Sequence, residues 1–210
     1  MRGPGKHRPR RLAEVKRFQS HRLARTYADL SAQPRYRAAT RFFLDDLYGE
    51  KDFSSRDREM LKIMPVMARV LPASAVDTAA SAIELEALSE SLDQALAEAL
   101  GEAKLDDASY AEAYRESSTR PDRERQVALV VAVGNRLDTL VRKPFIAQTL
   151  KLMRSPARVA GLSDLQDFLE RGFEAFRAMH GAHEFLETFS RREKQILAKL
   201  FSGNPDPFSG

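Results

Sequence analysis

Apolar side chains recur every three or four positions along most of the chain, from Leu12 to Phe201. This spacing places them on one face of an α-helix, whereas a half-buried strand would alternate with a period of two. Prolines and glycines interrupt the pattern at intervals and are typical of helix starts and stops. We therefore predict an all-α, single-domain helical bundle of about eight helices.

The two ends of the chain lack this pattern. The first ten residues, "MRGPGKHRPR", contain two Gly, two Pro and no apolar side chain after the initiator. We expect a disordered basic tail over residues 1–11, an all-helical domain over 12–203 and a disordered C-terminal tail over 204–210. A length of 210 residues suffices for one sizeable core and does not require a second domain.

The segment Val127–Val133, "VALVVAV", is the most apolar run and could by itself be a strand. Its flanks, "RPDRERQ" and "NRLDTLVRK", continue the helical period. We therefore expect a helix that opens at Pro121 and lies at the centre of the bundle. Gly134 and Gly172 fall mid-helix on apolar faces, which predicts a close approach of two helices at each.

Several helix boundaries can be predicted from capping residues and prolines. Ser54 with Asp57 resembles a capping box, and Pro65 should kink the helix that follows. Asp106 can cap a short helix. Pro144 and Pro156 should each start a short helical piece, and Ser163 should cap the next helix. The residues that carry these expectations are Ser54, Asp57, Pro65, Asp106, Pro144, Pro156 and Ser163.

Composition excludes several classes of site. The chain has no Cys, which rules out disulfides and thiolate-ligated metals. The longest apolar run is far shorter than the ~20 residues that cross a bilayer. We expect a cytoplasmic protein that does not enter a membrane.

Charge is distributed unevenly. Residues 1–25 contain nine Lys or Arg and one acid, Glu14, whereas residues 77–112 are acidic apart from Lys104. A basic arm of this kind can bind nucleic acid; it can equally be a solvated tail leading into a helix. The candidate nucleic-acid-binding residues are Lys6, Arg8, Arg10, Arg11, Lys16, Arg17, Arg22 and Arg25.

The stretch "FFLDDLYGEKDFSSRD" is rich in acids, but its carboxylates do not form one site. On a helix, Asp45 and Asp46 point in different directions, Asp52 lies in a loop and Asp57 suits a capping role. This stretch resembles the signature of an uncharacterised family of bacterial proteins. The resemblance continues through "IELEALSESLDQAL", "LVRKPFIAQTLKLMRSPARVAGL" and "LERGFEAFRAM". It implies a single all-helical domain of unknown function and supplies no catalytic residue.

Three polar residues project from otherwise apolar helix faces: Asp138, His180 and Glu193. Buried together, they could form an acid–imidazole–acid set that binds a small ligand or transfers protons. The structural alternative is that Asp138 pairs with Arg142 at i,i+4, Glu193 with an Arg of a neighbouring helix, and His180 with a carbonyl at its helix end.

The segment "HGAHE" does not match a known metal-binding pattern, because His180 and His183 are separated by Gly181 and neither H-E-x-x-H nor H-x-x-E-H occurs. Phosphate-binding and nucleophile motifs are also missing from the sequence. We therefore expect no metal and no cofactor.

The leading hypothesis is a non-enzymatic helical interaction protein that binds a protein partner or its own copy. Three aromatics off the main apolar stripes, Phe18, Phe42 and Tyr48, are candidate interface residues if they are exposed. They could equally pack under the basic arm. The alternatives are a nucleic-acid-binding module and a ligand-binding or enzymatic bundle.

Overall fold

The computed structural model describes residues 7–47, 59 and 73–209. These residues form nine α-helices and one π-helix, and none of them lies in a strand. The predicted all-α class is confirmed, and Val127–Val133 is helical. Predictions that involve Ser54, Asp57 and Pro65 fall outside the described residues.

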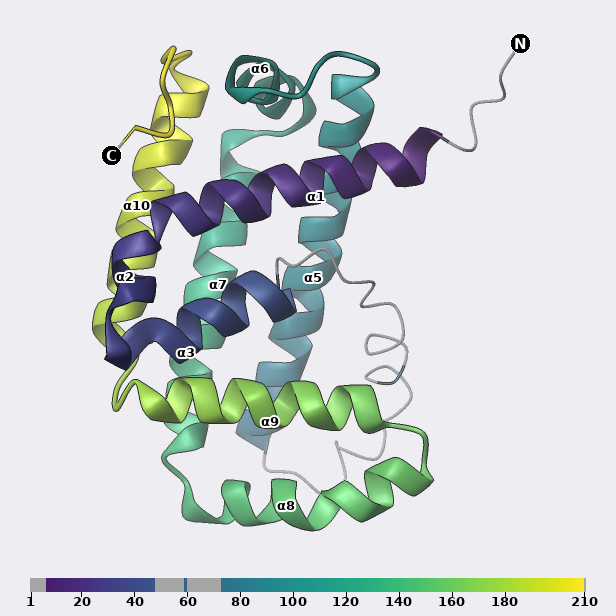
Figure 1. The fold of residues 1–210 in the computed structure, drawn as a ribbon, viewed down its shortest axis with the longest axis vertical. Helices are drawn as coiled ribbons and strands as arrows, with labels where there is room; N and C mark the ends of the chain where they lie inside the picture. The colour runs from purple at the N-terminus through teal and green to yellow at the C-terminus, as the bar shows by residue number, and fades with distance from the viewer. Residues whose placement is uncertain (1–6, 48–58, 60–72, 210) are drawn as a thin grey trace.

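The elements keep the labels of Figure 1. In chain order they are α1 (His7–Thr26), α2 (Ala28–Ala32), α3 (Pro34–Phe42), the π-helix η1 (Phe43–Leu47), α5 (Ala73–Leu100), α6 (Asp107–Ser117), α7 (Arg120–Val141), α8 (Pro144–Val159), α9 (Ser163–Ala178) and α10 (His183–Phe201).

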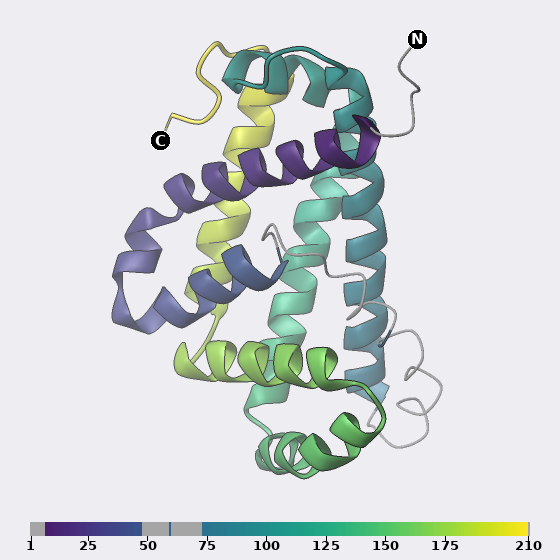
Figure 2. The same cartoon turned by 45° about the vertical axis from the view of Figure 1, so that its right-hand side comes forward.

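The helices form two crossing layers (Figures 1 and 2). Helices α5, α7 and α10 run along the long axis, and α1, α3, α9 and α8 lie across them. Helix α7 lies between α5 and α10 and also packs against α9 and α8, so the central position predicted for it is confirmed. Helix α6 covers the end of the bundle where α5 and α10 finish.

Two glycines allow these helices to approach each other closely. A Cβ built on Gly134 of α7 would lie 2.5 Å from Cδ2 of Leu186 in α10. A Cβ on Gly172 of α9 would lie 2.9 Å from Cζ of Phe42 in α3. Real Cβ atoms do not approach neighbours this closely, so both predicted close contacts are confirmed.

The buried apolar residues form two clusters. One joins α1, α2, α3, α7, α9 and α10 around Phe43, Phe176 and Leu186, and the other joins α1, α5, α6 and α10 around Val15, Leu96 and Tyr110. Helix α5 is continuous over its 28 residues. It packs against α7, α6 and α1.

Helix boundaries differ from prediction at one proline, Pro156, and one capping residue, Ser163. Residues 144–159 form one helix rather than two pieces, with Pro156 inside its last turn. Because proline has no backbone N–H, Pro156 removes one helical hydrogen bond, in the turn where the helix ends. Ser163 does not cap α9; instead the buried carboxylate of Glu59 accepts the N–H of Leu165 at 3.0 Å. The cap predicted at Asp106 is confirmed, with reciprocal bonds to Ser109.

Described structure extends into both segments that the sequence predicts to be tails. Helix α1 begins at His7, five residues before Leu12. At the other end, Pro207 is buried, and the Phe208 ring lies 5.9 Å from that of Tyr110 and 6.2 Å from that of Phe18. Aromatic packing therefore holds residues that composition alone assigns to a tail.

The acid-rich stretch contains a structural ion pair. Asp46 is buried in η1, and Arg171 of α9 donates to both of its carboxylate oxygens, with Nη2 2.8 Å from Oδ1. A bidentate pair of this kind ties η1 to α9.

Among the helices that the structure describes, none is both long and apolar enough to cross a membrane.

Candidate functional site

Asp138 has a structural role at the junction of α9 and α10. Its Oδ1 accepts the N–H of Ala182 at 3.0 Å, and its Oδ2 lies 2.5 Å from Nη2 of Arg142. Ala182 is the residue before the first turn of α10. Both carboxylate oxygens of Asp138 therefore have partners, including the predicted i,i+4 pair with Arg142.

His180 is exposed, so the prediction that it faces the core was wrong. Helix α9 ends at Ala178, and the helical period used for that prediction stops before it reaches His180. The backbone there turns into the left-handed region, with φ of 52° at His180 and 123° at Gly181. Arg35 of α3 secures this turn by donating to the carbonyls of Met179 and Gly181 at 2.8 and 3.2 Å.

Glu193 lies on α10 in the interior, where its side chain is 11 % exposed. Its Oε1 accepts from Nη1 of Arg22 at 2.6 Å and from the Tyr27 hydroxyl at 2.8 Å. Burial opposes the charge of Arg22, but Glu193 beside it raises the pKa of Arg22 above its usual value. The predicted pairing of Glu193 with an Arg of a neighbouring helix is confirmed.

Asp138, His180 and Glu193 do not share one site. Asp138 contacts Ala182, which precedes Glu193 by eleven residues, a separation of roughly 16 Å along α10 at ~1.5 Å per residue. Across the described part of the chain, no group of three His, Asp or Glu side chains is placed to hold a metal ion.

A cavity of about 350 Å³ lies between the two helix layers. Its walls differ along the long axis of the bundle. The polar end, towards α6, contains Gln19, Arg22, Asp93, Tyr110, Tyr114 and Arg123, and the charged residues Lys16, Glu86 and Glu90 also line the cavity. The apolar end, towards α8, is formed by Val130, Val133, Leu137, Leu150, Phe168 and Phe173. Glu193 lies on this wall, but Asp138 and His180 do not.

Arg123 of α7 is the most unusual residue of the polar end, because its side chain carries a charge and it is only 2 % exposed. Its Nε donates to Ser118 Oγ at 3.0 Å, its Nη1 donates to Gln126 Oε1 at 3.3 Å, and its guanidinium lies 4.1 Å from the centroid of the Tyr114 ring. Its Nη2 is buried without a hydrogen-bond partner. No carboxylate among the described residues lies within 4 Å of it.

Asp93 of α5 interacts electrostatically with Arg123, but burial raises the pKa of Asp93. Gln19 of α1 donates to its Oδ1 at 2.9 Å, and this bond and the charge of Arg123 only partly oppose the effect of burial. Burial likewise raises the pKa of Tyr110 and of Tyr114, which keeps both phenols neutral. The wall also contains Lys16, which pairs with Glu90, and Glu86, so Arg123 is distinguished by the lack of a carboxylate within 4 Å among the described residues.

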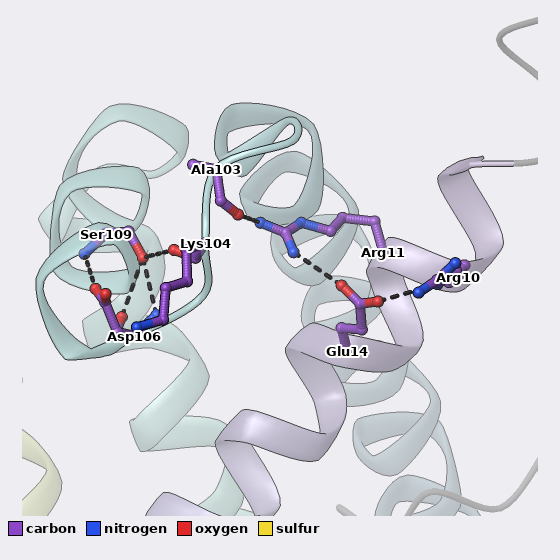
Figure 3. Close-up of polar contacts among 7 residues, drawn as sticks. All are labelled: Arg10, Arg11, Glu14, Ala103, Lys104, Asp106 and Ser109. Carbon is purple, nitrogen blue, oxygen red and sulfur yellow. Dashed lines mark hydrogen bonds and ion pairs between the residues drawn. The ribbon is translucent and has the colours of Figure 1, made fainter. Parts of the chain in front are cut away.

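The described basic residues of the N-terminal arm are mostly engaged within the molecule. Arg10 and Arg11 both bind Glu14, and Arg11 also donates to the carbonyl of Ala103 beyond α5 (Figure 3). Lys16 pairs with Glu90 at 2.6 Å, Arg22 with Glu193, and Arg25 lies 3.8 Å from Asp107. Arg17 has an exposed side chain, Arg8 contributes its backbone to α1, and Lys6 lies outside the described residues.

The candidate interface aromatics are packed inside the molecule. Phe42 is 6 % exposed and lies against Phe168 of α9 at a ring distance of 5.3 Å. Phe18 is half-buried and stacks on Tyr110 at 4.7 Å. Phe42 is therefore buried rather than at the surface, whereas Phe18 is only partly exposed because its ring stacks on α6. Tyr48 lies outside the described residues.

A family model for a domain of unknown function, DUF8198, matches residues 3–207. The chain belongs to this family. No curated protein and no solved structure matches it. Membership of the DUF8198 family is consistent with the single helical domain seen here, and any role for the cavity must be argued from its own residues.

Sequence reasoning missed Arg123 and Asp93, and assigned Arg22 to the surface arm. One signal was present for Arg123: it lies four, seven and eleven residues before Val127, Val130 and Gly134, the buried face of α7. A charged residue on the extension of an apolar face is as anomalous as Asp138, although Arg123 precedes the most apolar run of the helix.

Proposed function

We propose that this protein is a non-enzymatic binding protein whose cavity takes a small molecule with an acidic group, a carboxylate or a phosphate, and an apolar body. The observation that carries the proposal is Arg123, a buried cation with an unpartnered N–H and no carboxylate beside it among the described residues. A buried guanidinium of this kind is destabilising unless an acceptor is supplied. An acidic ligand would supply both the acceptor and the opposite charge.

The pairing of charges in the polar end supports an anion rather than a cation. Arg22 is paired with Glu193 and Lys16 with Glu90, and burial of Asp93 raises its pKa, which disfavours its charged form. Arg123, in contrast, has no carboxylate within 4 Å among the described residues. Arg22 also has a buried Nε with no hydrogen-bond partner, which adds a second available donor.

The rest of the cavity supports an apolar body for the ligand. Val133 of α7 follows Arg123 by ten residues, which corresponds to ~15 Å along the helix. Between them the wall is formed by Val127 and Val130, and beyond them it continues through Leu137. The volume of about 350 Å³ is within the ~300–1,000 Å³ range of small-molecule sites.

The sequence hypothesis of an enzymatic bundle receives less support. Asp138 and Glu193 are both held by arginines and other donors, and His180 is exposed away from them. The nucleic-acid alternative is also less supported, because most described cations of the arm already have carboxylate partners.

Isothermal titration calorimetry with defined probes tests this function. We expect decanoate or octyl phosphate to bind, and acetate, inorganic phosphate and decanol to bind at least about tenfold more weakly, because each lacks one half of the proposed ligand. The two binding probes distinguish a carboxylate from a phosphate as the acidic group.

The variant Arg123→Met should remove this binding. The matched control is Arg120→Met, three residues earlier on α7, where the side chain is exposed and pairs with Glu124. Binding of decanol as tightly as decanoate, or an equal loss in both variants, would contradict an acid-binding role for Arg123.

A further inference from the structure

Helix α8 lies at one end of the bundle (Figure 1), and its surface carries an exposed apolar stripe. It packs against α9 and α7. On its other side four large apolar residues are exposed: Phe145 by 46 %, Met153 by 39 %, Leu152 by 76 % and Val159 by 87 %. These values are well above what a core-facing residue shows, and contiguous exposed apolar side chains commonly mark an interaction site.

The stripe has the spacing that helix pairing uses. Phe145, Leu152 and Val159 are seven residues apart, so they fall within ~40° of one another around α8 and extend over ~21 Å along it. Met153 lies to one side of this line. A second helix laid along α8 would bury the three residues of this line in one seam. The stripe is one residue wide, narrower than the broad apolar face with which a helix enters a lipid surface.

The charge of α8 restricts what can occupy the stripe. The helix contains Lys151, Arg154 and Arg158 and no acidic residue. Arg154 is already bound by Glu170 of α9, with Nη2 2.6 Å from Oε2. Lys151 and Arg158 are exposed on the same flank of the stripe. A second copy of α8 would bring like charges together, which disfavours self-pairing.

We propose that α8 docks an amphipathic helix of another protein, in which acidic residues flank an apolar stripe of heptad spacing. The apolar seam provides the area that is removed from water, and Lys151 and Arg158 select a partner with carboxylates on the facing flank. This surface is independent of the cavity and of its ligand, since none of the four exposed apolar residues forms part of the cavity wall.

Two stapled helical peptides with the same leucine stripe test the proposal on the intact protein. Each has about 18 residues, enough to span roughly 25 Å. One has glutamates beside the stripe and the other has lysines. Fluorescence anisotropy should show that the acidic peptide binds about tenfold more tightly than the basic one, as expected for two rim ion pairs.

Variants separate the apolar and the electrostatic contributions. Leu152→Glu should abolish binding of both peptides, and the double variant K151E/R158E should reverse the preference between them. All three substituted side chains are exposed, so the fold should be retained. Ala128→Glu, on an exposed position of α7, serves as the control and should leave binding unchanged.

Three results would overturn the proposal. One is equal binding, or no binding, of the two peptides. Another is association with vesicles of anionic phospholipid that Leu152→Glu abolishes, which would make α8 a membrane-surface helix. The third is a dimer in sedimentation that the same variant dissociates, which would make the partner a second copy of this chain.

Discussion

The ion pair between Arg22 of α1 and Glu193 of α10 should be strongly coupled energetically. The two side chains are 12 % and 11 % exposed, and their N–O distance is 2.6 Å. Removing one partner from a buried pair leaves an uncompensated charge, at about 3–5 kcal/mol of unfolding free energy. Arg22→Met and Glu193→Leu should each destabilise the protein by that amount. For a chain of this length, this corresponds to roughly 6–20 °C in Tm.

The double variant R22M/E193L should recover most of the loss. With both charges gone, the remaining loss of stability comes from the Tyr27 hydroxyl, which donates to Glu193 in the parent protein and has lost this acceptor. That hydrogen bond is worth about 1 kcal/mol. The coupling between the two substitutions should therefore be at least about 3 kcal/mol. Urea unfolding of the parent, the two single variants and the double variant, followed by circular dichroism, measures this coupling.

Arg120 and Glu124 provide the matched control pair. They lie at i,i+4 on α7 with side chains 57 % and 48 % exposed, so their coupling should be only about 0.3–0.5 kcal/mol. If R22M/E193L loses as much stability as the sum of its single variants, within about 0.5 kcal/mol, the two side chains act independently and the structural assignment of Glu193 fails.

Three further predictions concern the cavity, the helix contacts and the basic arm. Burial raises the folded-state pKa of Asp93, so the stability contributed by its protonated form is present below the ordinary aspartate pKa and is lost as pH rises through the raised value. In urea unfolding, Asp93→Asn should therefore gain stability relative to the parent as the pH rises above about 4, the ordinary aspartate pKa, and a relative loss over that rise would show that ionised Asp93 is stabilised instead. Gly134→Ala should destabilise by about 1–3 kcal/mol through overpacking against Leu186, and the loss should disappear in the background of Leu186→Ala; an unchanged Tm in the single variant would refute the close contact. Because its cations are paired, the arm should bind duplex DNA with a salt slope shallower than about −3, and a slope near −6 measured by fluorescence anisotropy would restore the nucleic-acid hypothesis.

The features that depend on local spacing could be predicted from the sequence. The apolar faces of α9 and α10 are buried as expected, with Phe173, Phe176, Phe185 and Leu186 in the interior. The period of a helix depends only on neighbouring residues, so it can be determined without knowing the partner helix. The close contact at Gly134 was predicted in the same way, because a glycine on an apolar helix face is typical of a site where two helices approach each other.

The features that depend on which helices meet could not be predicted. Glu59 replaces Ser163 as the acceptor at the start of α9, although more than one hundred residues separate it from Leu165. The sequence also cannot show that Phe208 returns to Tyr110. Arg123 was missed because a charged residue outside an apolar run resembles a solvated flank until the packing of α6 over it is known.

The central claim is that an acidic group binds beside Arg123 in the polar end of the cavity. The most direct measurement is the pH titration of the carboxyl ¹³C resonance of labelled decanoate bound to the protein. A cation at hydrogen-bond distance should lower the pKa of the bound carboxyl by about 1–3 units below its ordinary range of about 4–5, and Arg123→Met should remove that shift. A bound carboxyl whose pKa is raised would place the acid among apolar side chains, and would contradict the proposed site.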